Sequence, residues 1–413
     1  MCHVLGAGLG YGTQVVLARW MDTTAYGTYV YILSWITLLS MACGLGLPTA
    51  ALRYIPTYRV QKAVGLLKGF ITQSRRLVLS ASAGMALAGS GLLYLLPPFT
   101  TDQAVLIALW VIPPLALLQL ETQILRAHHR MVAAYGPLHV LRRLVVLGGV
   151  SALVLLSMSI SPQVVLIISG AAAGLSLLVQ RRATWTGRPN QWARHTPELR
   201  TRSWLAVALP LILGRGVLIL INKMDILMIG GMLHLSPVGI YNAALQTAHA
   251  ALFTGVAIDA VAAPKLARLH ARADATALQQ SVSRFAHWYF WPTLGAALGI
   301  ALASEFILGL FGPSFHAARP ALFILLIGFV VNAGLGPHLS LMRVADLQNV
   351  LIRIYGGCLM GNLVLNAAGI WAFGITGAAV ATAATLVLAG LWMRRAVLTH
   401  LDVDTSLIYA LRK

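Results

Sequence analysis

Apolar stretches of about 20 residues alternate with short polar segments along the whole 413-residue chain. Each stretch is long enough to cross the ~30 Å hydrocarbon core of a bilayer as an α-helix. We place twelve of them, at residues 4–21, 29–48, 77–96, 104–125, 144–160, 163–180, 204–228, 238–262, 285–310, 320–342, 354–372 and 375–393. Backbone polar groups in lipid must be satisfied internally, and these stretches are too long and continuous for barrel strands. The pattern therefore predicts an all-α integral membrane protein.

The 30 lysine and arginine residues are concentrated between these stretches. Six clusters hold 26 of them, and only Arg19, Arg215, Lys223 and Arg319 lie elsewhere. The clusters run over Arg53–Arg76, Arg126–Arg143, Arg181–Arg202, Lys265–Arg284, Arg343–Arg353 and Arg394–Lys413. Between successive clusters there is room for two crossings joined by a nearly uncharged turn, as expected when basic loops stay in the cytoplasm. The pattern predicts that both termini are cytoplasmic.

Composition supports a membrane protein and excludes several other classes. Hydrophobic residues make up 58% of the chain and charged residues 10%, whereas a soluble domain carries about 25% charged residues. The net charge of +19 does not indicate nucleic-acid binding, because the basic residues form separate short loops rather than one continuous face. Their spacing fits contact with anionic lipids of the cytoplasmic leaflet. Cys2, Cys43 and Cys358 form no motif for a disulfide framework or for zinc.

The longest polar stretch divides the predicted spans six and six. We predict an N-terminal lobe at 1–180, a basic cytoplasmic linker at 181–202, a C-terminal lobe at 203–394 and a cytoplasmic tail at 395–413. The two halves match at an offset of 212, most clearly where Gly27 and Tyr29 correspond to Gly239 and Tyr241. Because each half has six spans, both halves begin on the same side of the membrane. This predicts a parallel repeat of the kind found in alternating-access carriers.

The N-terminal end does not read as a signal peptide. Only three residues precede the first apolar run, and they include neither a basic region nor a cleavage site. A misassigned start codon that drops upstream residues is consistent with this short beginning.

Several motifs resemble a known family in their order and spacing. They are Ala25-Tyr-Gly-Thr-Tyr, Gly44-Leu-Gly-Leu-Pro48 with Arg53-Tyr-Ile-Pro56, Asp225-Ile-Leu-Met-Ile-Gly230, Val238-Gly-Ile-Tyr-Asn-Ala-Ala244, Ala263-Pro-Lys-Leu266, Leu308-Gly-Leu-Phe-Gly312 and the run from Asn366 to Ala381. From about residue 8 to 395 the chain resembles the polysaccharide transporters, the Wzx-like lipid-linked oligosaccharide flippases of the MOP superfamily. That superfamily also holds the MATE exporters and the peptidoglycan-precursor flippase. The resemblance implies translocation of an undecaprenyl-diphosphate-linked glycan from the cytoplasmic to the outer leaflet of the bacterial inner membrane.

Two cations within the predicted spans are candidates for binding the diphosphate of such a substrate. Arg215 stands between Gly214 and Gly216 in the seventh span, and an arginine fork suits phosphate oxygens. The alternative is an interhelical ion pair with an acidic residue such as Asp259 or Asp225. Lys223 either shares the cavity-facing side of the same helix or extends to the outer headgroups.

Two aspartates are candidates for coupling to H⁺ or Na⁺. Asp225 lies at the outer end of the seventh span, and Asp259 lies toward the cytoplasmic end of the eighth. Each either changes its ionic partner during transport or forms an ordinary structural ion pair. Glu121, in the fourth span, has the same two interpretations, and the structural one is favoured. The chain has no phosphate-binding loop motif, so nothing indicates ATP hydrolysis or a bound cofactor.

Uncharged polar residues form stripes at helical spacing. They are Asn242, Gln246 and His249 in span eight, Gln119, Thr122, Gln123 and Arg126 in span four, and Asn362 and Asn366 in span eleven. Such stripes either provide a hydrophilic wall for sugar hydroxyls or hold helices together by hydrogen bonds. A glycan polymerase or other assembly protein is a further expected partner.

Two other functions remain as alternatives. A membrane-embedded glycan polymerase or ligase would be expected to carry a sizeable external loop, and the external turns here are short. A MATE-like exporter of small cations needs carboxylates in its lumen. The charged residues deep in the predicted spans of this chain are instead mainly positive, namely Arg215 and Lys223.

Overall fold

The computed structural model describes residues 2–95, 103–186, 195–272 and 274–411. Within these ranges all regular structure is helical and there is no strand, which confirms the predicted all-α class. Seven of the described helices are long and apolar enough to cross a membrane, and up to nine if each of two bent pairs is one span. The chain forms two compact units, residues 1–219 and 220–413. The predicted lobe boundaries at 180 and 203 stay a prediction.

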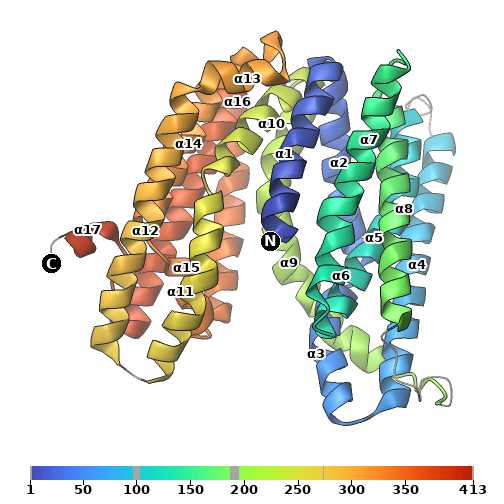
Figure 1. Cartoon of the computed structure of the whole chain (residues 1–413), viewed down its shortest axis with the longest axis horizontal. Helices are drawn as coiled ribbons and strands as arrows, with labels where there is room; N and C mark the ends of the chain where they lie inside the picture. The colour runs from blue at the N-terminus through green and yellow to red at the C-terminus, as the bar shows by residue number, and fades with distance from the viewer. Residues whose placement is uncertain (1, 96–102, 187–194, 273, 412–413) are drawn as a thin grey trace. The chain divides into compact units, whose positions relative to one another are not determined.

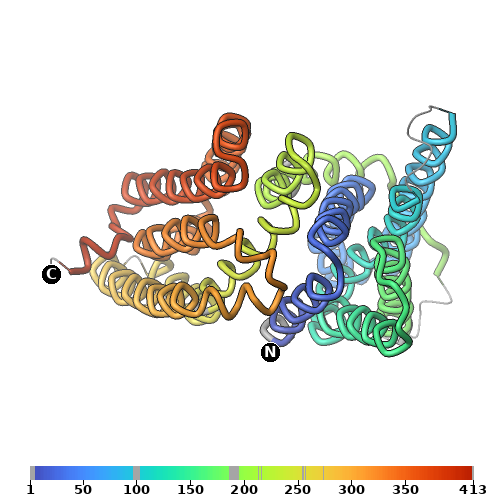
Figure 2. The backbone as a smooth tube through the Cα atoms, turned by 90° about the horizontal axis from the view of Figure 1, so that it is seen from above, coloured from blue at the N-terminus to red at the C-terminus, as the bar shows by residue number. Residues whose placement is uncertain are grey.

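The N-terminal unit is a bundle in which α5 takes the central place (Figure 1). Its helices are α1 (Cys2–Trp20), α2 (Thr23–Cys43), α3 (Leu47–Val60), α4 (Val64–Leu95), α5 (Gln103–Ala127), α6 (Met131–Gly136), α7 (Arg142–Leu155) and α8 (Pro162–Thr186). Helix α5 packs against α2, α3, α4 and α8, while α7 lies alongside α8 (Figure 2). Most of α5 is buried because leucine, isoleucine and alanine occupy all its faces.

Glycine allows the tight connection between α2 and α3. Gly46 has a left-handed φ of 69°, and a Cβ there would lie 1.9 Å from the carbonyl oxygen of Ala208. Pro48 follows in the first turn of α3, where its missing N–H leaves no helical bond unmade. The Gly44–Pro48 motif therefore encodes a turn held closely against the first part of α9 (Thr201–Met232).

Residues 181–186 of the predicted linker belong to α8, whereas the part around His195 and Glu198 lies against α4. The backbone N–H of Glu198 donates to the carbonyl of Gly65 at 3.0 Å, and Lys68 Nζ donates to the carbonyl of His195 at 2.9 Å. A Cβ at Gly69 would lie 1.8 Å from the carbonyl oxygen of Glu198. Residues 195–200 are thus fixed to the N-terminal unit by backbone contacts that glycine permits.

One segment that was predicted to lie in a cytoplasmic loop is helical instead. Helix α6, a π-helical turn at Pro137–Leu141 and α7 form one apolar segment, Met131–Leu155, long enough to cross the membrane. The helical segment begins at Met131, about three and a half turns before the predicted start of the span at 144. Arg142 and Arg143 consequently lie within this helical segment and not in a loop with Arg126 and Arg130. The apolar run from Met131 to Leu141 extends the helix, and the two arginines interrupt that run rather than end it.

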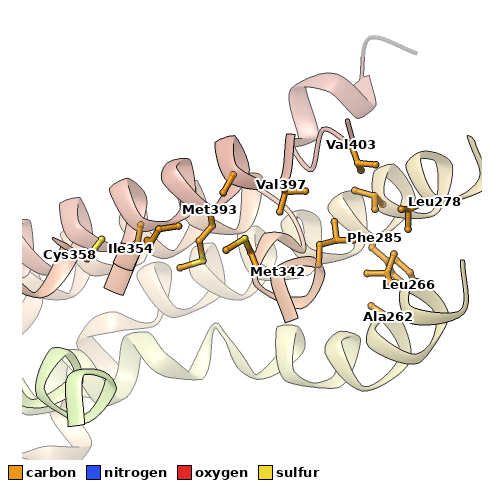
Figure 3. Close-up of a cluster of buried hydrophobic side chains, with 14 residues drawn as sticks. Ala262, Leu266, Leu278, Phe285, Met342, Ile354, Cys358, Met393, Val397 and Val403 are labelled. Atoms are coloured by element: carbon orange, nitrogen blue, oxygen red, sulfur yellow. The ribbon is translucent and has the colours of Figure 1, made fainter. Parts of the chain in front are cut away.

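The C-terminal unit contains the second part of α9 and the helices that follow it. They are α10 (Leu235–Ala250), α11 (Phe253–Ala271), α12 (Ala275–Leu302), α13 (Ser304–Phe311), α14 (Arg319–Gly334), α15 (His338–Val344), α16 (Gln348–Leu401) and α17 (Leu407–Leu411), with a 3-10 turn at Pro313–Ala318. A cluster of buried apolar side chains from α11, α12, α15 and α16, joined by Val403 after α16, forms part of its core (Figure 3).

Helix α16 is a hairpin of two helical halves. Gly374 has φ 58° and ψ −134°, which breaks the helix between the two predicted spans at 354–372 and 375–393. The halves approach so closely that a Cβ at Gly377 would lie 1.8 Å from the carbonyl oxygen of Gly369. Only glycine permits this backbone contact, and the contact brings polar residues of the two halves together.

The segment after α16 is fastened to the C-terminal unit. Arg394 donates two hydrogen bonds to the carboxylate of Asp404, at 2.8 and 2.6 Å, and the Gln279 side chain makes two 2.9 Å bonds with the Asp404 backbone. Burial raises the pKa of Asp404, but the bonds from Arg394 and Ser406 outweigh it and hold the pKa below its ordinary value. Asp404 also accepts from the N–H of Ser406 just before α17, so this aspartate has a structural role.

Candidate ion and substrate sites

Asp225 is the centre of a buried polar cluster within the C-terminal unit. Its side chain is 3% exposed and lies on α9. Tyr241 of α10 donates to Oδ2 at 2.8 Å, and Thr382 of the second half of α16 donates to the same oxygen at 2.7 Å. Asn366 of the first half of α16 donates to Oδ1 at 3.4 Å. Three neutral donors from three segments therefore surround one carboxylate.

The cluster continues along the α16 hairpin. Asn366 Nδ2 also donates to the side-chain oxygen of Asn362 at 3.0 Å, and Asn362 Nδ2 donates to Thr385 at 3.1 Å. The side-chain oxygen of Asn366 is buried and has no partner. Carboxylate, amide and hydroxyl oxygens are the ligands that hard cations prefer. This arrangement suits a proton or a small metal cation at Asp225.

Lys223 lies close to this cluster without forming an ion pair. It is half-buried, and its charge acts on both Asp225 and His249. The ring of His249 stacks on Phe329, with centroids 5.4 Å apart and planes 8° apart. The structure thus places Lys223 at the edge of a polar interior, with no carboxylate within salt-bridge distance among the described residues.

The stripe on α10 is partly buried within the unit. Asn242 is fully buried, whereas Gln246 and His249 are half-buried. Tyr241, which the repeat pairs with Tyr29, is also buried, and it supplies a donor that the stripe prediction did not include. The Gly-x-Tyr motif in the sequence was the signal that marked it.

Asp259 is the centre of a second acidic cluster in the C-terminal unit. Its Oδ1 accepts hydrogen bonds from the hydroxyls of Tyr289 on α12 and Ser340 on α15. His338, at the start of α15, is buried and its Nδ1 has no hydrogen-bond partner. Asp259 is half-buried, so it is less enclosed by protein than Asp225.

The polar stripe on α5 makes hydrogen bonds inside the N-terminal unit. Gln119 donates to Ser40 of α2 at 3.0 Å. Gln123 accepts from Arg126 at 2.8 Å, and the Arg126 guanidinium lies 5.5 Å from the ring centroid of Tyr135. These contacts join α5 to α2 and α6, which is the helix-holding interpretation of the stripe.

Glu121 forms a buried ion pair. It is 1% exposed and accepts two hydrogen bonds from Arg75 of α4, at 2.5 and 2.8 Å, and one from Thr184 of α8 at 3.0 Å. This bidentate geometry supports the favoured structural interpretation, because both carboxylate oxygens accept hydrogen bonds from the arginine that supplies the counter-charge.

Arg142 and Arg143, at the start of α7, lie within a helical segment and not in the loop to which the sequence assigned them. Both side chains are half-buried, and the charge of each acts on Tyr29. The guanidinium of Arg143 donates to the carbonyl of Gly6 on α1. The apolar run before them was the signal that the helix continues through them. The backbone of Arg215 lies in α9, but its side chain is outside the described residues, so neither interpretation of it is tested.

Comparison with known proteins adds a family and a fold. A family model described as polysaccharide biosynthesis protein matches residues 1–270. No curated protein matches the chain. One similar solved structure is a multidrug resistance MATE family transporter of the MOP superfamily in an inward-facing conformation. It superposes with a TM-score of 0.74 at 13% sequence identity, and the match covers 95% of this chain and 94% of that chain. The lipid II flippase MurJ, in an inward closed conformation, has a TM-score of 0.74 at 12% identity, over 100% of this chain and 90% of that chain. These likenesses show the helical fold of a multi-pass membrane transporter.

Proposed function

Because the chain belongs to the polysaccharide biosynthesis protein family, we propose that it is a flippase for lipid-linked oligosaccharide. The substrate is an undecaprenyl-diphosphate-linked unit of O-antigen, capsule or exopolysaccharide, which moves from the cytoplasmic to the outer leaflet of the bacterial inner membrane. The family match over residues 1–270 carries this proposal, and the fold shared with a lipid II flippase supports it. The protein acts as a transporter and not as an enzyme.

The proposed topology has twelve crossings in two six-helix lobes, with both termini in the cytoplasm. The hairpin in α16 supplies the last two crossings, and the segment Met131–Leu155 supplies the fifth. Cysteines introduced at positions 62, 190 and 272 are expected to react only from the cytoplasm, and those at 100, 235 and 316 only from outside. Labelling of position 190 from outside would contradict the two-lobe layout, because it would change the number of crossings in the first half.

We assign ion coupling to Asp225 first and to Asp259 second. The chain has no nucleotide motif, and one charge moving through the membrane potential releases about 2.3 kcal/mol per 100 mV. Coupling requires a group whose ion binding differs between two conformations. Asp225 meets the chemical requirement because its hydrogen-bond partners among the described residues are neutral donors, and Lys223 lies near it without forming an ion pair. Asn362 and Asn366 then belong to the ion site and not to a sugar-binding wall.

The remaining polar candidates line the proposed path of the glycan. Gln246, His249 and Lys223 are half-buried and remain available for sugar hydroxyls or phosphate. Arg215 is proposed for the diphosphate, while Gln119, Gln123, Arg126 and Asn242 are proposed as weaker contributors. Anionic lipids of the cytoplasmic leaflet and a glycan polymerase are the proposed partners.

The test is flipping of a fluorescent undecaprenyl-diphosphate oligosaccharide in proteoliposomes, read as loss of fluorescence to a membrane-impermeant quencher. We expect protein-dependent flipping that increases with an imposed pH or sodium gradient. Absence of flipping under both gradients would reject the proposal. If the rate of flipping does not change with either gradient, the protein is a facilitator driven by the substrate concentration difference alone.

A MATE-like exporter is the second candidate, because a MATE transporter shares this fold. The same vesicles loaded with a fluorescent organic cation discriminate between the two functions. Gradient-driven movement of the cation without flipping of the glycan lipid would favour the exporter.

A further inference from the structure

The two halves of α16 form a groove of about 550 Å³ within the C-terminal unit. Its lining consists mainly of glycines and apolar side chains, among them Gly357, Gly361 and Leu365 of the first half and Leu388, Leu391 and Trp392 of the second. The four large side chains are between 39% and 55% exposed, so the groove is open on one side. Apolar surface of this kind is stable when another apolar group covers it.

Glycine makes the groove hollow. No atom lies within 4 Å of the Cβ that would be added at Gly361, so the space above this residue is open. At Gly357 an added Cβ would lie 2.9 Å from the ring of Trp392, so the indole lies directly against the first half of the hairpin. Cys358 also lines the groove, and it belongs to the buried cluster behind it (Figure 3). An apolar chain can therefore lie over Gly361 without displacing any part of the protein.

Two exposed arginines lie at the end of the groove that is remote from the bend. Asn362 donates to Thr385 across the hairpin, so residues at similar distances from the bend at Gly374 lie opposite each other. Arg353 and Arg395 are equally far from Gly374 along the chain, and Arg395 lines the groove itself. The two positive charges therefore lie at the same level of the hairpin.

Neither charge is compensated by a carboxylate among the described residues. Asp404 pairs instead with Arg394, the neighbour of Arg395 in sequence, at 2.6 Å. The Nε of Arg353 donates to the carbonyl of Asn349 in its own helix at 3.4 Å, which leaves its positive charge unpaired. An apolar groove with unpaired guanidinium groups at one end is complementary to a ligand that has an apolar chain and an anionic head.

The length of the groove matches one acyl chain. At a rise of ~1.5 Å per residue it spans roughly 12 Å from Gly357 to Leu365, and roughly 15 Å from Thr385 to Arg395. One leaflet contributes half of the ~30 Å hydrocarbon core of a bilayer, which is about 15 Å. The polyprenyl chain of a lipid-linked glycan is much longer than this. The groove therefore fits a phospholipid of the surrounding bilayer better than it fits the proposed substrate.

We propose that this groove binds one acyl chain of an anionic phospholipid and that Arg353 and Arg395 bind its phosphate. Both arginines lie just outside the predicted spans at 354–372 and 375–393, where basic side chains meet lipid headgroups. The site does not depend on which substrate the protein transports. Only its assignment to the cytoplasmic leaflet rests on the proposed topology.

The test measures quenching of Trp392 fluorescence by phospholipids that carry bromine on their acyl chains. The protein is reconstituted in phosphatidylcholine bilayers that contain increasing amounts of brominated phosphatidylglycerol or brominated phosphatidylcholine. The emission of Trp392 is the difference between each protein and the same protein with Trp392→Phe. Because a basic residue near the surface attracts anionic lipid, we expect the relative affinity for phosphatidylglycerol to be higher by on the order of tenfold.

Two variants separate a bound lipid from ordinary contact with the bilayer. Arg353→Gln combined with Arg395→Gln removes the charges from two exposed side chains and should abolish the preference for phosphatidylglycerol. Gly361→Leu fills the open space of the groove, so the quenching of Trp392 that remains should show no preference between the two lipids.

Each variant has a matched control. Arg181→Gln combined with Arg182→Gln removes two exposed charges near the end of α8 and should leave the preference unchanged. Gly356→Leu adds the same side chain to the same helix outside the groove lining, at a position where an added Cβ also meets no atom within 4 Å. It should bind phosphatidylglycerol like the wild type.

Equal quenching by the two lipids in the wild type would overturn the proposal, because ordinary bilayer contact has that result. A preference that persists in the arginine double variant or in Gly361→Leu would also overturn it. If Gly361→Leu does not accumulate in the membrane, the arginine double variant decides alone, since it changes exposed side chains. Unlabelled undecaprenyl diphosphate that displaces the brominated lipid at lower amounts than unlabelled phosphatidylglycerol would assign the groove to the substrate and overturn the phospholipid assignment. The assay contains no transported glycan, so its outcome is separate from that of the flipping assay.

Discussion

The substitution Gly377→Ala tests the hairpin that assembles the Asp225 cluster. The added Cβ would lie 1.8 Å from the carbonyl oxygen of Gly369 and 2.2 Å from its carbonyl carbon. Ordinary contact begins near 3.4 Å, so the two halves of α16 must separate by roughly 1.6 Å, the difference between the two distances. The obstructing atoms are backbone and cannot turn aside. Overpacking of this kind costs about 1–3 kcal/mol and at times more.

Thermal unfolding in detergent measures the effect, with Gly361→Ala as the matched control on the same helix. No atom lies within 4 Å of the Cβ that would be added at position 361. That change should stabilise the helix by up to about 1 kcal/mol, because alanine has the higher helix propensity. The two variants are therefore expected to differ by about 2–4 kcal/mol. A melting temperature for Gly377→Ala at or above that of Gly361→Ala would refute the close backbone approach.

The same variant should also affect transport. Asn366 and Thr382 lie on opposite halves of the hairpin, and both donate to Asp225. Separation of the halves lengthens at least one of these bonds. Gradient-driven flipping should consequently fall more than flipping driven by substrate concentration alone.

Three further predictions concern the charged candidates. Asp225→Asn should remove the response of flipping to an imposed pH or sodium gradient and retain substrate binding. The control Asp274→Asn, at an exposed helix cap, should transport like the wild type. A gradient response that survives Asp225→Asn would exclude this carboxylate from coupling. Glu121→Gln should lower stability by about 3–5 kcal/mol in thermal unfolding, because it leaves Arg75 buried without its counter-charge; an unchanged melting temperature would contradict that reasoning. Arg215→Ala should abolish glycan export with folded protein still in the membrane, and Arg215→Lys should restore it only partly; full activity of the alanine variant would rule out a diphosphate-binding role.

Much of the architecture could be predicted from local pattern. Hydropathy and the clusters of basic residues predicted an all-α membrane protein, and Gly374 separates the two spans that were placed at 354–372 and 375–393. The resemblance of short glycine-containing motifs predicted the family that the match over residues 1–270 shows. These features are local because a helix in lipid must satisfy its backbone within itself, so length and apolar content are enough to indicate it.

The sequence did not predict correctly whether a basic residue next to an apolar segment lies in a loop or in the helix. Arg142 and Arg143 follow Arg126 and Arg130 closely in sequence, so they were assigned to the same loop. In the structure the second pair lies within the helical segment Met131–Leu155, about three turns after its start. Periodicity does not say where a long helix enters the membrane, because a basic residue fits either a loop or a polar interior.

Only the tertiary structure decided which polar side chains form hydrogen bonds or ion pairs with one another. The sequence indicated Asp225, Asn362 and Asn366 as separate polar candidates, and the α16 hairpin unites them with Tyr241 and Thr382 around one carboxylate. It equally left Glu121 with two interpretations until Arg75 was found beside it. A hydrogen bond depends on positions within about 3 Å, and residues far apart in sequence reach such positions only when helices pack. The sequence therefore indicated which apolar helices carry polar groups, and packing determined which of these groups form hydrogen bonds with one another.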